Sequence, residues 1–217
     1  MIRTLSLTLL VFLLSAAAGG RVSAWKEVKK KFYSSGELKQ VIPYEDGEID
    51  GRMQLYNKEG DLTQEIIFDM GKKERAVVYY ENGMVAVERH YVDGKLEGVE
   101  KGYYENGAIK TETPYSKGEI DGNVRGYSKN GNISVITPYG RGFIDGIEKA
   151  YYEDGAVKHE IRFKRSVMEG ESVRYENDGS YSVIPYKEGL RHGTVRHYDR
   201  EGNLVREEEY KKGWLKK

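Results

Sequence analysis

Four histidines are the residues of this chain best suited to hold a metal ion or to move a proton: His90, His159, His192 and His197. No cysteine is available to join them, and no His-Glu-x-x-His motif of a zinc site occurs. His192 and His197 fall in one expected strand, but five residues apart they point to opposite faces. The histidines therefore favour solvated or turn positions. We expect no metal, no cofactor and no catalytic residue, and predict that the protein is not an enzyme.

Carboxylates are abundant and recur beside glycines, as in Glu48-Ile49-Asp50 and Glu119-Ile120-Asp121. Turn chemistry accounts for them better than acid–base catalysis, because Asp and neighbouring glycines are what tight turns use. Calcium in these acidic turns is an alternative, although the spacing lacks the dense Asp ladder of calcium loops. No Gly-Lys-Ser/Thr element of a phosphate-binding loop is present.

A set of tyrosines is the better candidate for binding. Each of them directly follows another aromatic residue in what we expect to be a strand, so alternation places it on the opposite face. Phe143 and Tyr181 are further aromatics outside the repeated pattern. Outward tyrosines on a polar sheet would suit contact with a protein or a sugar, whereas the simpler reading is that they cover a back face. The expected partner-binding residues are Tyr33, Tyr80, Tyr104 and Tyr152.

The element that positions these residues is an internal repeat. Glycines that we call hairpin glycines recur every 23 or 24 residues, at 36, 60, 83, 107, 131, 155, 179 and 202. Four residues before each lies a lead aromatic (32, 56, 79, 103, 127, 151, 175 and 198), and seven or eight residues after each lies a second aromatic (44, 68, 91, 115, 139, 163, 186 and 210). A fixed period of this length is the signature of an array of stacked units.

Each unit is predicted to be a β-hairpin with a further turn. Asn-Gly or Asp-Gly at most hairpin glycines favours a two-residue turn with both residues at positive φ. A second turn follows the second aromatic, as in Tyr44-Glu-Asp-Gly47, and a third glycine then opens the next strand, as at Gly51 and Gly122. Alternation puts Ile109, Thr111 and Tyr115 on one face. The lead aromatic and the aliphatic residue two positions after the hairpin glycine are expected to form one apolar stripe, with the opposite face charged.

The fold class that follows is all-β: an elongated, twisted, single-layer antiparallel β-meander of eight tandem hairpin repeats, open-ended like a solenoid. Of the 26 glycines, 21 occupy the three repeat positions, and all four prolines directly precede a second aromatic. Proline cannot donate to a sheet ladder, so the strand is expected to end or to bulge there. Stability must come from packing between neighbouring repeats, since a lone hairpin is marginal and no disulfide is available.

These units resemble MORN repeats, and most closely the bacterial MORN variant of the YwqK-type antitoxin repeat family. The resemblance rests on Tyr79-Tyr80-Glu81-Asn82-Gly83, on its counterparts at 103–107 and 151–155, and on the spaced glycines that follow. It covers residues 25–217 and implies a scaffold that contacts proteins, with lipid binding connected to some arrays. Departures occur at Arg75, where the third glycine is missing, and at Ser166, which replaces the glycine of the second turn.

The first 24 residues lie outside the array and read as a secretory signal peptide, with Arg3, an apolar run and small residues up to Ala24. An uncleaved anchor is the alternative. Residues 25–217 then form a single array of eight repeats, in a protein that is secreted, periplasmic or attached to the cell envelope. Their 33 basic and 35 acidic residues give no drive toward nucleic acid. Trp25 and Trp214, with nearby lysines, are expected to cap the array.

The functional hypothesis is an exported, non-enzymatic protein-interaction scaffold, antitoxin-like by resemblance only. Two alternatives remain open: a glycan or cell-envelope binder that stacks sugars on tyrosines, and a binder of lipid surfaces. The sequence also leaves open a homo-oligomer that associates by its ends or its faces.

Overall fold

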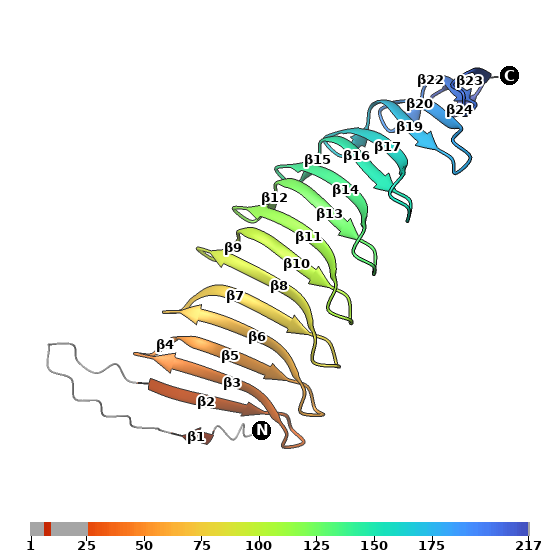
Figure 1. The fold of residues 1–217 in the computed structure, drawn as a ribbon. Helices are drawn as coiled ribbons and strands as arrows, with labels where there is room; N and C mark the ends of the chain where they lie inside the picture. Colours follow the sequence, from red (N-terminus) through yellow and green to blue (C-terminus); the bar gives the residue numbers. More distant parts are fainter. Residues whose placement is uncertain (1–6, 10–25, 217) are drawn as a thin grey trace, which may run out of the picture. The chain divides into compact units, whose positions relative to one another are not determined.

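The computed structural model describes residues 7–9 and 26–216, and it contains no helix in that part of the chain, hence no helical membrane span. The chain divides into two compact units, residues 1–107 and 108–217, which are described separately. In each unit, consecutive strands pair antiparallel with their sequence neighbours, as the meander prediction requires (Figure 1). The all-β class is confirmed.

The strands of the first unit are β1 (Leu7–Leu9), β2 (Lys26–Phe32), β3 (Leu38–Glu45), β4 (Glu48–Ile49), β5 (Gly51–Tyr56), β6 (Leu62–Asp69), β7 (Lys72–Tyr79), β8 (Val85–Val92), β9 (Lys95–Leu96) and β10 (Gly98–Tyr103). Apart from β1, which pairs with β2, the expected signal peptide lies outside the described residues.

The strands of the second unit are β11 (Ile109–Ser116), β12 (Glu119–Ile120), β13 (Gly122–Tyr127), β14 (Ile133–Gly140), β15 (Phe143–Ile144), β16 (Gly146–Tyr151), β17 (Val157–Lys164), β18 (Val167–Met168), β19 (Gly170–Tyr175), β20 (Tyr181–Lys187), β21 (Leu190–Arg191), β22 (Gly193–Tyr198), β23 (Leu204–Lys211) and β24 (Trp214–Leu215). Figure 1 shows the short strands of this unit, such as β12 and β15, at one edge and the hairpin loops at the other.

The hairpin glycines do not form the two-residue turn that the sequence predicts for them. At the hairpin glycines only the glycine has positive φ, as at Gly83 (79°), and its N–H donates to the carbonyl of Tyr80 at 3.0 Å. This is a type I turn closed by a left-handed glycine, a three-residue loop. The two-residue turn with both residues at positive φ is instead the second turn, for example Asp93 (49°) and Gly94 (76°).

In most repeats a β-bulge directly follows the hairpin loop, and it changes which residues share a face. Tyr127 pairs with Ile133, but the next pair is Gly126 with Val135, so one residue of β14 is left over. The lead aromatic and the aliphatic residue therefore do face each other, as predicted. Counting every second residue through the bulge gives the wrong face, however. In β14, Val135 and Thr137 share a face with the second aromatic Tyr139, whereas Ile133 lies on the opposite face.

The buried cluster of the first unit lies on the face of the second aromatics, while one further buried residue, Val77, lies on the face of the lead aromatics. Ile42, Met53, Ile66 and Ala76 are its buried members, and the second aromatics Tyr44, Phe68 and Tyr91 pack against them. The lead aromatic face carries hydrogen-bonded charges instead: the hydroxyl of Tyr79 donates to Glu65 at 2.7 Å. The expected division into one apolar and one charged face is thus incorrect.

Proline and the third glycine form a matched pair. The third glycine divides the first strand of the repeat, so that β15 and β16 are separated at Asp145. A Cβ atom at Gly146 (φ 124°) would lie 3.0 Å from Cγ of Pro138, and one at Gly122 would lie 3.1 Å from Cγ of Pro114. The interruption leaves no ladder acceptor for the N–H that proline lacks, which explains why proline is tolerated there.

Candidate functional site

The tyrosines predicted to bind a partner begin the hairpin loops instead of continuing the strands. Tyr33, Tyr80 and Tyr152 each follow the last residue of a strand, and each is half-buried. Their hydroxyls donate to the backbone carbonyl of the lead aromatic in the next repeat: Tyr33 to Tyr56 at 2.7 Å, Tyr80 to Tyr103 at 2.6 Å and Tyr152 to Tyr175 at 2.8 Å. Tyr104 occupies the equivalent position and is also half-buried.

These contacts give the tyrosines a role that the parity argument did not anticipate. Each hydroxyl ties one repeat to the next, and only the faces of the ring are left for a partner. The ring of Tyr152 has the cation of Lys158 5.7 Å from its centroid, and the ring of Tyr33 has that of Lys39 at 5.3 Å. Cations at this distance are attracted to the π face of the ring.

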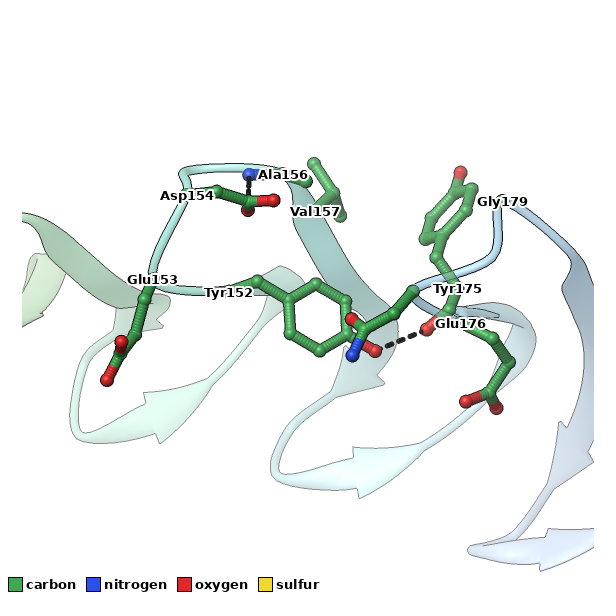
Figure 2. Close-up of a pocket in the computed structure, with 9 residues that line it drawn as sticks. Tyr152, Glu153, Asp154, Ala156, Val157, Tyr175, Glu176 and Gly179 are labelled. Carbon is green, nitrogen blue, oxygen red and sulfur yellow. Dashed lines mark hydrogen bonds between the residues drawn. The ribbon is translucent and has the colours of Figure 1, made fainter.

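One groove brings such a tyrosine together with a lead aromatic (Figure 2). It is an open depression of about 780 Å³ between two consecutive hairpin loops of the second unit. In Figure 2 the Tyr152 ring reaches the backbone of the next loop through its bond to Tyr175. The groove is lined by Tyr152, Glu153, Asp154, Ala156, Val157, Tyr175, Glu176, Asn177 and Gly179. We call it the loop groove.

The loops that form the groove are held by their own side chains. Asp154 accepts a hydrogen bond from the backbone N–H of Ala156 at 2.9 Å, and Asp178 accepts from that of Ser180 at 2.9 Å. Hydrogen bonds from the Ser180 hydroxyl and backbone lower the pKa of Asp178, so this carboxylate stays ionised in the loop. The groove is therefore lined by loops with internal hydrogen bonds, and its negative charge comes from Glu153, Asp154 and Glu176.

A second depression, of about 500 Å³, contains an aromatic stack that sequence reasoning missed. The rings of Tyr181 and Tyr198 stack with centroids 4.7 Å apart, and Tyr175 lies 5.9 Å from Tyr181 on the other side. Tyr181 stands where most repeats have an aliphatic residue, directly opposite both lead aromatics in the ladder. In the sequence, the stack could have been found from Tyr181, because a tyrosine replaces the usual aliphatic residue at a position that faces two lead aromatics.

The same depression contains a hydroxyl, an imidazole and a carboxylate that lie next to one another in a row. The Ser182 hydroxyl lies 2.8 Å from Nδ1 of His197, and Nε2 of His197 lies 3.8 Å from Glu208. Nη2 of Arg206 is closer to that nitrogen, at 3.3 Å. Ser182, His197 and Arg206 are direct partners on adjacent strands, so the contacts form a cross-strand ladder. Glu208, at 3.8 Å, is beyond hydrogen-bond distance of the imidazole and does not orient it as the carboxylate of a catalytic triad would.

The other histidines stand apart from one another. His159 lies 3.7 Å from Glu148 and His90 lies 3.6 Å from Glu88, and Glu88 also forms an ion pair with Arg75. The backbone N–H of His192 donates to Pro185 in the bend beside its third glycine. Among the described residues, no three side chains of His, Cys, Asp or Glu are grouped so that they could hold a metal ion.

The pKa values of two lead tyrosines are raised by burial and by hydrogen bonds to glutamates of the preceding repeat. Burial, and then the hydrogen bond to Glu65, raise the pKa of Tyr79 to about 12. Burial and the bond to Glu112 raise the pKa of Tyr127 in the same direction, with the two oxygens 2.7 Å apart. These tyrosines remain protonated donors at neutral pH, so they serve as ties between repeats rather than as acids or bases.

The repeat unit itself identifies the family. The MORN repeat variant family matches the chain four times, over residues 75–93, 96–117, 144–165 and 191–212. The chain contains MORN repeats. Each matched segment of this MORN array ends at the first residue of a second turn, which has positive φ in all four cases: Asp93, Lys117, Arg165 and Lys212. No curated protein matches the chain.

Proposed function

We propose that this MORN array is an exported, non-enzymatic scaffold that binds a partner protein at the loop groove. The observation that carries the proposal is the groove at Tyr152 and Tyr175, where ring faces are combined with the carboxylates of loops with internal hydrogen bonds. Tyrosine offers a large contact area with few rotamers to lose, which suits modest protein interfaces. An antitoxin-like role is drawn from the family resemblance alone.

Site-specific photo-crosslinking tests the partner and its location together. A photo-reactive amino acid is placed at Glu153, in the groove, or at Lys58, which has the same place in a repeat where Asn57 replaces the tyrosine. A protein adduct that forms in cells from position 153 and not from position 58 would support the proposal. If neither position, nor those next to Tyr33 and Tyr80, yields a protein adduct, the scaffold function is refuted.

Export has its own test. The apolar leader ending near Ala24 motivates cell fractionation and amino-terminal sequencing of the protein. A secreted or envelope-bound chain that begins at Trp25 is the expected result. A cytosolic chain that retains residues 1–24 would overturn this part of the proposal.

Glycan binding is the second candidate, favoured by the stack of Tyr181 on Tyr198 beside Arg174, Glu176 and Ser182. Aromatic faces next to polar side chains are suited to stacking a sugar ring. Envelope saccharides titrated into the protein should then quench tyrosine fluorescence. Tyr181→Leu, which places at this position the residue found in several other repeats, should abolish the quenching. Unchanged fluorescence of the parent would exclude this candidate.

A further inference from the structure

A row of exposed apolar side chains runs along the second turns of the second unit. Phe143, Val167, Leu190 and Trp214 each come directly after a second turn, and their exposed fractions are 45%, 43%, 49% and 81%. In the other four repeats the same position holds a charged residue: Glu48, Lys72, Lys95 and Glu119. The apolar character is therefore a property of these four turns and not a requirement of the repeat.

Backbone hydrogen bonds stack the turns that carry this row. The second-turn N–H of each repeat donates to the preceding short strand: Ser166 to Ile144 at 2.7 Å, Gly189 to Met168 at 3.0 Å and Gly213 to Arg191 at 2.9 Å. Neighbouring row positions are thus separated by two strand spacings, about 10 Å.

The side chains of the row lie against the following turn. A Cβ atom at Gly189 would be 3.8 Å from Cγ1 of Val167, and one at Gly213 would be 3.7 Å from Cδ2 of Leu190. The guanidinium of Arg165 lies 5.2 Å from the centroid of Phe143. The four side chains therefore form a continuous strip in which each of the first three packs against the turn of the next repeat. We call this strip the turn strip.

The charge beside the turn strip is basic, in contrast to the other turns. Segments 140–145, 164–169, 187–192 and 211–216 contain eight Lys or Arg and three Asp or Glu, a net charge of +5. The four corresponding segments, 45–50, 69–74, 92–97 and 116–121, contain four basic and ten acidic residues, a net charge of −6. Arg141, Lys164, Arg165, Lys187, Lys211 and Lys212 are all exposed.

We infer that the turn strip is the docking site for an acidic amphipathic helix of a partner protein. The inference rests on the proposed scaffold function and names a second surface for it. Seven residues of an α-helix rise about 10.5 Å, close to the spacing of about 10 Å between strip positions. One apolar residue per heptad can therefore contact each of the four side chains in turn, while acidic residues on both flanks meet the lysines and arginines.

The geometry favours a helix over a membrane surface. Three of the four apolar side chains are only about half exposed, at 43–49%, so they form a shallow seat and do not project for insertion. Glu188 lies within the strip, and the carboxylate of Glu169 accepts the backbone N–H of Glu188 at 2.9 Å. These fixed negative charges reduce the attraction to any anionic surface, so the choice of a helix over a membrane rests on the shallow, half-exposed seat.

The test is fluorescence anisotropy of the full chain with a labelled synthetic helix of about 21 residues, roughly the length of the strip at 1.5 Å per residue. The probe carries leucine once per heptad on its seam, glutamate on both flanks and alanine elsewhere. We expect saturable binding, weakened at least about tenfold by Val167→Lys/Leu190→Lys. Lysine already occupies this position at Lys72 and Lys95, so the fold should be retained. The variant adds positive charge, so weaker binding would report the lost apolar contacts.

Three controls complete the test. Arg165→Asp, chosen because Asp93 has the same turn conformation, should weaken binding and reduce its salt dependence. A probe with lysine in place of glutamate should not bind. With Trp25→Phe as background, Trp214 emission should shift to the blue when the probe binds.

The inference is overturned if the parent does not bind the acidic probe, or if Val167→Lys/Leu190→Lys binds it as tightly as the parent. Binding to phosphatidylserine vesicles without binding to the probe would also overturn it and would assign the strip to a membrane. A protein adduct that still forms at Glu153 under any of these outcomes would leave the scaffold function standing.

Discussion

Gly146→Ala probes the contact between proline and the third glycine. Gly146 has a φ of 124°, where an L-residue is strained by about 1–2 kcal/mol. The added Cβ would also lie 3.0 Å from Cγ of Pro138, a rigid ring that cannot move its end away, and overpacking of this kind costs at least about 1 kcal/mol. We therefore expect a loss of about 3 kcal/mol in the free energy of unfolding.

Gly131→Ala is the matched control. Gly131 also has positive φ, 88°, but nothing lies within 4 Å of its Cβ position, so only the strain of about 1–2 kcal/mol should remain. Adding Pro138→Ala to Gly146→Ala should recover about 1 kcal/mol, because the clash is removed. Urea unfolding followed by circular dichroism measures all four proteins, with the m-value checked because the chain has two compact units. Equal losses at the two glycines, or no recovery in the double variant, would refute the packing argument.

Three further outcomes are expected. The folded-state pKa of Tyr79 is raised from 10.0 to about 12, so its stabilising effect is full below about pH 10 and is lost as the pH rises toward 12; Tyr79→Phe should flatten the stability of the protein over that window, and identical alkaline profiles would contradict this. Tyr152→Phe should lower the stability of the second unit by about 1 kcal/mol through loss of the bond to Tyr175, and a melting temperature equal to that of the parent would show that this tie is dispensable. Gly107→Val should destabilise by about 2 kcal/mol or more because φ is 84°, whereas Gly140→Ala, at a strand position with open space, should be tolerated; similar melting of the two variants would disprove the turn assignment.

The sequence predicts the repeat, the strand class and the places of the turns, because glycines at fixed spacing are demanded by backbone conformation. It does not predict which turn has two residues at positive φ. Asn82-Gly83 favours such a turn by composition, yet Asp93-Gly94 adopts it. The three-residue loop at Gly83 is followed by a bulge, and the hydrogen bonds that create the bulge join residues of two strands. Such a one-residue shift in strand register cannot be recognised from the alternation of residue types in the sequence.

The candidate site shows the same boundary between local and non-local information. Tyr152 is found from sequence as an aromatic outside the repeat pattern, but its bond to Tyr175 depends on how consecutive loops stack. Phe143 and Trp214 are each visible as unusual residues, whereas their membership of one strip emerges only when the second turns are aligned by their backbone bonds. Comparing the repeats position by position would have revealed the change from charged to apolar residues.

The hydrogen bonds between repeats have a direction along the chain, and this bears on the order in which the repeats fold. The Tyr33 hydroxyl donates to the Tyr56 carbonyl, which comes later in the chain. The Gly71 N–H donates to the Ile49 carbonyl, which comes earlier in the chain. In the described part of the chain the hydrogen-bond partners are within about one repeat of each other, so contact order is low and each hairpin can dock on a neighbour that has already folded. The newest repeat is always the least secured, because its tyrosine is still without an acceptor. A chain truncated between two repeats would therefore form a shortened array in which only the last hairpin is frayed.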